Sequence, residues 1–67
     1  MNKNLLRSIM LLHNDTNKSL AKFLGISERS FSDKINERST EFKQNEIRSI
    51  KLKYNLSDEQ VSNIFFN

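Results

Sequence analysis

Apolar residues recur along this chain at every third or fourth position, the spacing that places side chains on one face of an α-helix. No segment alternates apolar and polar residues, so the pattern predicts helices and no strand. The first apolar stripe predicts a helix over about residues 3–13 that ends near Asn14. The stripe consists of Leu5, Leu6, Ile9 and Leu12.

A second predicted helix follows Thr16, whose hydroxyl suits the position that caps a helix N-terminus. The inner face of this helix carries Leu20, Ala21 and Leu24. The only glycine of the chain, Gly25, comes next, and glycine adopts the left-handed conformation at a helix C-terminus without steric cost. We therefore expect the second helix to end at Gly25.

Ser27 is placed to cap a third helix that has Phe31 and Ile35 on its inner face. Two short helices joined through a glycine-containing turn describe a helix-turn-helix, here over about residues 17–36. Because the two helices of such a unit cross steeply, the residue at their contact must be small. Ala21 meets that requirement.

After the third helix, a polar loop over residues 37–41 leads to Phe42, which we expect to be an apolar anchor. A fourth helix is predicted by the stripe of Ile47, Ile50 and Tyr54. Ser57 and Gln60 have the spacing of a capping box and predict the start of a fifth helix. Its inner face consists of Val61, Ile64 and Phe65. The short connections favour a compact all-α domain of five helices that spans residues 1–67.

Composition excludes several classes of protein. With 67 residues and no cysteine, the chain is expected to form one small domain without a disulfide framework or a thiolate metal site. No apolar run approaches the roughly 18 residues of a membrane span. His13, the only histidine, is expected to pack or cap rather than bind a metal, and Asp58 and Glu59 suit the first turn of a helix. Because the chain offers no set of nucleophile, base and pocket, we expect neither enzyme activity nor a cofactor. The lack of cysteine fits a cytoplasmic location.

The charge of the chain is distributed unevenly. The formal net charge is +3, and residues 1–36 carry six Lys or Arg against three Asp or Glu. Residues 37–67 carry five of each sign. The positive excess therefore lies in the half that contains the predicted helix-turn-helix, which favours a polyanionic partner.

The segment TNKSLAKFLGISERSFSDKIN, residues 16–36, resembles the Cro/lambda-repressor-like helix-turn-helix family, also called XRE-type regulators. The tail FKQNEIRSIKLKYNLSDEQVSNIFF is similar to the closing helices of short phage-encoded members. The resemblance implies a five-helix lambda-repressor-like domain that binds double-stranded operator DNA as a homodimer in a bacterial host cell. The short chain favours a Cro-like role over that of a repressor with a cleavable C-terminal domain.

Three features depart from the family pattern. Asn17 stands where a longer glutamine usually opens the second helix, and Phe23 stands where a charged residue is usual. After the third helix, the common Gly-Lys pair is replaced by Glu37-Arg38, which retains the cation but leaves the shape of the loop open.

In the family, the third helix lies in the major groove and presents its outward residues to base edges. The candidate base-reading residues here are Glu28, Arg29, Ser32, Asp33 and Asn36. Arg29 suits guanine and Asn36 suits adenine, because each pair can form two hydrogen bonds. The carboxylates of Glu28 and Asp33 either accept from cytosine amino groups, orient Arg29 or discourage wrong sequences. The candidate phosphate contacts are Asn17, Lys18, Ser27, Lys34, Arg38 and Lys43.

Several apolar residues project away from the predicted inner faces, namely Leu11, Phe23, Leu52 and Phe66. Leu52 and Phe66 are the candidates for a homodimer or partner surface, although a small domain also exposes some apolar groups without a function. Besides a Cro-like regulator that occludes a promoter, an antirepressor on the same fold that binds another repressor protein stays open. A DNA-binding protein without sequence preference is the third alternative, and the modest charge argues against it.

Overall fold

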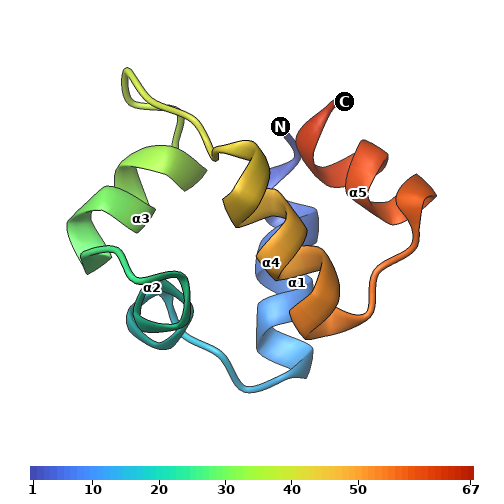
Figure 1. Ribbon diagram of the computed structural model, residues 1–67, viewed down its shortest axis with the longest axis horizontal. Coiled ribbons are helices and arrows are strands. Elements are labelled where there is room, and N and C mark those ends of the chain that lie inside the picture. The colour runs from blue at the N-terminus through green and yellow to red at the C-terminus, as the bar shows by residue number, and fades with distance from the viewer.

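The structure of the protein is a computed structural model that describes residues 1–67. It contains five α-helices and no strand, which confirms the predicted all-α fold. The helices are α1 (Lys3–Leu12), α2 (Asn17–Leu24), α3 (Glu28–Ile35), α4 (Gln44–Tyr54) and α5 (Asp58–Phe65) (Figure 1). Every helix falls short of the length and apolar character that crossing a bilayer requires.

Hydroxyl side chains cap three of the helices, as the sequence predicts. Thr16, Ser27 and Ser57 each accept a hydrogen bond from the backbone N–H three residues further along, at the starts of α2, α3 and α5. The Gln60 side chain accepts a hydrogen bond from the N–H of Ser57, which completes the predicted capping box. Because each such cap contributes about 1 kcal/mol, these helix starts are fixed by local sequence.

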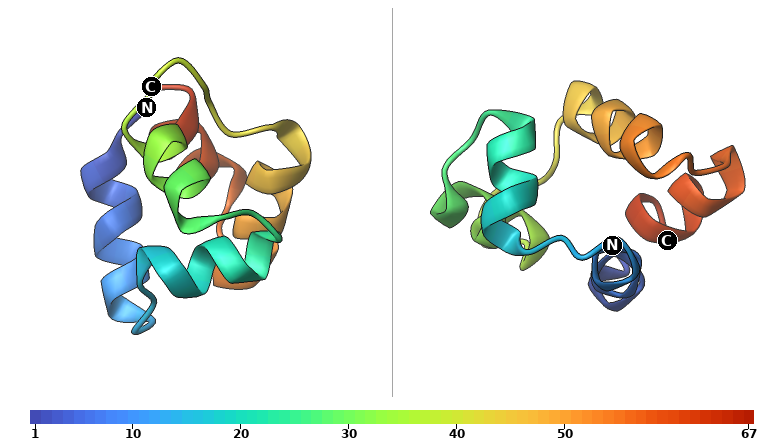
Figure 2. Two further views of the ribbon diagram at one scale, coloured as in Figure 1. Left: turned by 90° about the vertical axis from the view of Figure 1, so that its left-hand side faces the viewer. Right: turned by 90° about the horizontal axis from the view of Figure 1, so that it is seen from below.

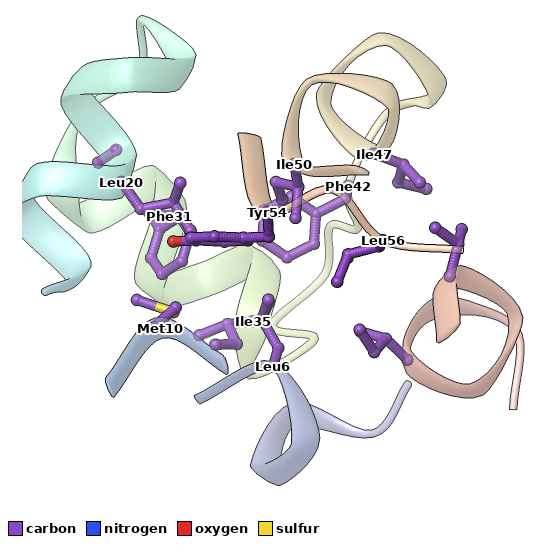
Figure 3. Close-up of a cluster of buried hydrophobic side chains, with 13 residues drawn as sticks. Leu6, Met10, Leu20, Phe31, Ile35, Phe42, Ile47, Ile50, Tyr54 and Leu56 are labelled. Carbon is purple, nitrogen blue, oxygen red and sulfur yellow. The ribbon is translucent and has the colours of Figure 1, made fainter. Parts of the chain in front are cut away.

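One hydrophobic core joins the five helices and the segments between α3, α4 and α5 (Figure 3). The side chains that are almost fully buried in it are Phe31, Leu6, Leu20, Ile35, Ile50 and Ile64. Phe42 is buried and meets the rings of Phe31 and Phe65 edge-on, at centroid distances of 5.6 and 5.8 Å, which confirms its role as an apolar anchor. Leu56, between α4 and α5, also belongs to the core, although the sequence pattern did not predict its burial.

The inner face of α1 differs from the prediction. Leu12, expected in the apolar stripe, is 82% exposed, whereas Met10 is buried. Leu6 and Met10 are four residues apart and therefore lie one above the other, while Leu12 is turned away from them by the 3.6-residue period. Leu5 and Ile9 pack against the edge of the core.

The turn between α1 and α2 is tied to the end of α4 through Asp15. Its carboxylate accepts hydrogen bonds from the Tyr54 hydroxyl at 2.7 Å and from Ser19 Oγ at 2.8 Å, and Lys53 Nζ lies 3.6 Å away. The Tyr54 hydrogen bond, with Ser19 and Lys53, holds the pKa of Asp15 below its ordinary value despite partial burial. The ring of His13 packs against Tyr54 with 4.8 Å between centroids, as expected for a packing residue.

The helices are arranged so that α2 and α3 pack together at one side of the molecule, whereas α5 packs against α1 and α4. In the left-hand view of Figure 2, α2 and α3 lie in front and no other helix covers α3. The two chain ends lie side by side at one end of α3 (Figures 1 and 2). They are joined by a hydrogen bond of 2.7 Å from the N–H of Asn2 to the carbonyl of Ile64.

Candidate nucleic-acid interface

α2 and α3 form a helix-turn-helix whose corner is built as the sequence predicts. Ala21 is 1% exposed where the two helices meet, and Gly25 has a φ of 74° in the left-handed region. The N–H of Gly25 donates to the carbonyl of Lys22, and the N–H of Ile26 donates to the carbonyl of Ala21. A Cβ atom at Gly25 would meet no atom within 4 Å. Glycine is therefore required here for its backbone conformation and not for space.

The N-terminal half of the outward face of α3 is free. Glu28 and Arg29 are both exposed, and neither takes part in an ion pair within the chain. Glu28 lies in the first turn, where the helix dipole stabilises a carboxylate. The guanidinium of Arg29 therefore retains all its donors for an external partner.

The C-terminal half of the same face is occupied by contacts within the protein. Ser32, Asp33 and Asn36 are half-buried. The amide of Asn36 donates to the carbonyl of Ser32 at 2.9 Å, and its Oδ1 accepts from Lys3 Nζ at 3.1 Å. Both ends of the Asn36 amide are thus engaged, so Asn36 is less free to meet a base than the sequence suggested.

Arg38 folds back over this half of α3. Its N–H donates to the carbonyl of Asp33 at 2.8 Å, and its Nη1 lies 3.6 Å from Asp33 Oδ1 and 3.5 Å from Ser32 Oγ. The N–H of Glu37 donates to the carbonyl of Lys34 at 3.2 Å, and Glu37 has a φ of 55°. These two backbone bonds are those of a Schellman helix end, in which a left-handed residue turns the chain back. The loop thus turns sharply without a glycine.

The other candidate phosphate contacts differ in exposure. Lys18, in α2, and Lys43, directly before α4, are exposed, and Asn17 is half-buried at the start of α2. Ser27 is exposed, but its hydroxyl already accepts from the N–H of Ser30 at 3.0 Å to cap α3. Among the candidate phosphate contacts, the exposed cations are therefore Lys18, Arg38 and Lys43.

The structure corrects the prediction made for Lys34. It was predicted to contact phosphate, but it is 7% exposed, and its Nζ donates to Glu46 Oε1 at 2.9 Å. The same oxygen accepts from the N–H of Lys43 at 2.8 Å and so caps α4. Burial alone would raise the pKa of Glu46, but the hydrogen bonds from Lys43 and Lys34 outweigh it and hold the pKa below its ordinary value. The charge of Lys34 is neutralised inside the protein, where it joins α3 to α4.

Comparison with family models adds one finding. A model described as "Protein of unknown function (DUF739)" matches residues 4–67. The chain belongs to the DUF739 family. No curated protein and no solved structure matched the chain.

The two candidate partner-surface residues of this DUF739 domain lie apart. Leu52 is 74% exposed and Phe66 is 61% exposed, which confirms that both project from the core. Phe66 lines an open groove of about 420 Å³ at the start of α4 and the end of α5. The groove is lined by Met1, Glu37, Glu41, Phe42, Gln44, Ile47, Phe65 and Phe66. Leu52 is not among them and lies about two turns further along α4.

Sequence reasoning missed two groups that shape the C-terminal end of α3. Lys3 bonds to Asn36, and the amino group of Met1 forms an ion pair with Glu37. No local signal identifies these partners, because 33 residues or more separate each pair along the chain.

Proposed function

We propose that this DUF739 protein is a non-enzymatic regulator of transcription that reads double-stranded operator DNA with α3 in the major groove. The observation that carries the proposal is the placement of α3. It stands on the Ala21–Gly25 corner at one side of the molecule, and its outward face is not covered by another helix (Figure 2). A single α-helix fits the width of the major groove.

Arg29 is the residue we propose as the principal base reader. It is exposed near the N-terminus of α3, the end that meets base edges in helix-turn-helix proteins. An unpaired guanidinium can donate to both O6 and N7 of guanine, a contact worth about 1–3 kcal/mol of discrimination. The carboxylate of Glu28 beside it repels phosphate. Positions of α3 on DNA in which this carboxylate has no base to accept a hydrogen bond from are therefore unfavourable.

The surrounding cations supply the part of the binding that does not depend on sequence. Lys18, Lys43 and Arg38 are exposed around the helix-turn-helix and are proposed to contact phosphates. If a dimer neutralised about six phosphates, the affinity would fall with salt at a log–log slope of about −5.

We propose that the protein acts as a homodimer that occludes a promoter in the bacterial cytoplasm, in keeping with its resemblance to short Cro-like regulators. Leu52 and the groove beside Phe66 lie apart, and each offers an exposed apolar surface for self-association. A symmetric dimer would require two operator half-sites about 34 Å apart, one turn of the duplex.

The test begins with selection of bound duplexes from random DNA, followed by titration of the selected duplex and a scrambled duplex. Arg29→Ala is expected to reduce the preference for the selected duplex by about tenfold, with helicity unchanged. Arg48→Ala removes the same charge from the exposed surface of α4 and serves as the matched control. It should leave the preference unchanged. Failure of the wild-type protein to prefer any duplex at low salt would overturn the proposal.

A second candidate function is an antirepressor that binds another regulator protein. It is favoured by the exposure of Leu11, Leu12, Phe23, Leu52 and Phe66 on a chain of this size. Two carboxylates on the outward face of α3 also favour it, because they repel phosphate. A tight complex with a partner repressor, together with no binding to duplexes at low salt, would establish this function in place of the first.

A further inference from the structure

The C-terminal half of α3 combines an acid and a base on the face that we propose for DNA. Asp33 carries a negative charge there, which would oppose the approach of phosphates if it stood alone. It does not stand alone, because Arg38 Nη1 lies 3.6 Å from Asp33 Oδ1 and 3.5 Å from Ser32 Oγ. The side chain of Asp33 is 32% exposed and that of Arg38 is 64% exposed. The guanidinium is therefore the outer group of the pair and the carboxylate is the inner one.

We propose that Asp33 is a specificity-determining residue that positions Arg38, and that Arg38 makes the contact with DNA from this end of α3. This inference rests on the proposed function. A guanidinium carries five N–H donors in a rigid fork. Its contacts to Asp33 and Ser32 involve one terminal nitrogen, and the side chain is 64% exposed, so the other donors have no partner within the chain and are free for a base edge or a phosphate.

The backbone supports this arrangement. The left-handed Glu37 turns the chain so that the N–H of Arg38 donates to the carbonyl of Asp33 at 2.8 Å. The amino group of Met1 holds the Glu37 carboxylate and so fixes the turn from the other side. Because both the backbone and the side chain of Arg38 are restrained before binding, less conformational freedom is lost when DNA binds.

The pair also discriminates between duplexes. A placement on DNA that keeps Arg38 beside Asp33 leaves no unpaired carboxylate at the interface. A placement that draws Arg38 away to another phosphate leaves the Asp33 charge facing the DNA backbone, which is unfavourable. Asp33 thus favours one position of Arg38 over others, although it need not touch a base.

The experiment compares the affinity of each variant for the selected duplex and for the scrambled duplex at one salt concentration. Asp33→Asn keeps the size of the side chain and removes its charge. It is expected to bind the scrambled duplex more tightly and to lose about tenfold in preference for the selected one. Glu59→Gln is the matched control, because Glu59 is an exposed carboxylate in the first turn of α5, outside the proposed DNA-binding face, and has no ion-pair partner. It removes the same charge and should leave the preference for the selected duplex unchanged.

Combining the changes at Asp33 and Arg38 distinguishes an Asp33 that positions Arg38 from an Asp33 that contacts a base directly. Arg38→Lys keeps the charge and removes the fork, and it is expected to reduce the preference about as much as Asp33→Asn does. The double variant should lose no more preference than Arg38→Lys alone, because both changes remove the same contact. Far-UV circular dichroism and the melting temperature, unchanged in each variant, show that α3 is intact.

Two results would overturn this inference alone. In the first, Asp33→Asn keeps the wild-type preference. In the second, the losses of preference from Asp33→Asn and Arg38→Lys multiply in the double variant, and Asp33→Asn loses discrimination at a single base pair of the operator. That result would make Asp33 a residue that reads a base directly. If the wild-type protein prefers no duplex, the proposed function fails and this inference fails with it.

Discussion

The two turns that bound α3 have the same left-handed backbone, but different forces hold them there. The turn before α3 contains Gly25, for which a φ of 74° carries no steric penalty. The turn after α3 contains Glu37, whose φ of 55° is unfavourable by about 1–2 kcal/mol for a residue with a Cβ atom. The ion pair between Glu37 and the amino group of Met1 holds Glu37 in that conformation, as do the contacts of Arg38 with Asp33.

The difference has a consequence for function. The left-handed backbone of a turn that rests on a glycine and a serine cap needs no distant partner, and this turn fixes the N-terminal end of α3 where Arg29 lies. The turn at Glu37 depends on residues from the chain start and from α3 itself, so changes elsewhere in the domain reach the C-terminal end of α3. Strained residues of this kind persist only where surrounding contacts hold them.

The largest expected effect comes from Phe31, which anchors α3 between the two turns. Phe31→Ala should destabilise the protein by about 3–5 kcal/mol, because a fully buried aromatic ring is replaced by a cavity. That loss is comparable with the whole stability of a domain of this size, so both turns should unfold together. Thermal unfolding followed by circular dichroism measures it. Phe23→Ala, at a ring that is 52% exposed, is the control and should cost far less.

An effect of similar size is expected at the buried ion pair between Lys34 and Glu46, which joins α3 to α4. Glu46→Ala leaves the Lys34 ammonium buried without a partner and should destabilise the protein by about 3–5 kcal/mol in urea unfolding. Replacing both residues together, Lys34→Met with Glu46→Leu, should recover most of the loss, because no charge is left buried. A double variant as unstable as Glu46→Ala would contradict this account.

The same pair gives a pH dependence with a defined sign. The pKa of Glu46 in the folded protein lies below its ordinary value of 4.5, so folding favours the ionised carboxylate. The stabilisation is therefore fully present above that ordinary value and is lost as the pH falls through the lower, folded-state pKa. Urea unfolding at pH values between 7 and 3 measures the loss, which should be smaller in the double variant than in the wild-type protein.

A smaller effect is expected at the first turn. Gly25→Ala should destabilise the protein by about 1–2 kcal/mol, because alanine resists the left-handed conformation. No steric clash contributes, since a Cβ atom there meets nothing within 4 Å. Gly25→Asn should cost less than Gly25→Ala, because asparagine tolerates this region. Equal losses for the two variants, measured by urea unfolding, would show that space and not backbone conformation explains the glycine.

The smallest effect is expected at the second turn. Glu37→Gly removes the backbone strain and the ion pair with Met1 together, so we expect a change within about 0.5 kcal/mol. Glu37→Ala removes the ion pair but keeps the strain, and it should be less stable than Glu37→Gly by about 1 kcal/mol. Urea unfolding of the two variants side by side measures this difference. If alanine proves as stable as glycine here, the turn is not left-handed in solution.

Much of the fold follows from local patterns. The hydroxyl caps at Thr16, Ser27 and Ser57 mark the observed starts of α2, α3 and α5, and the apolar stripes predict all five helices. The candidate site follows only in part. Arg29 lies on the exposed face of α3 as predicted, whereas Lys34 lies in the core and Asn36 is bonded to Lys3. The helical period alone places Lys34 and Asn36 near the boundary of the outward face. A partner from a distant segment, Glu46 for Lys34 and Lys3 for Asn36, then decides which contact each side chain makes.

The sequence by itself therefore determined the five helices and the glycine corner, because caps, stripes and a left-handed glycine act over a few residues. The tertiary structure decided the rest: the burial of Lys34 against Glu46, the left-handed Glu37 and the position of Arg38 over Asp33. The physical reason is that a buried charge needs a partner and a strained residue needs a restraint. For Lys34 and Glu37, that partner or restraint lies 12 or more residues away along the chain.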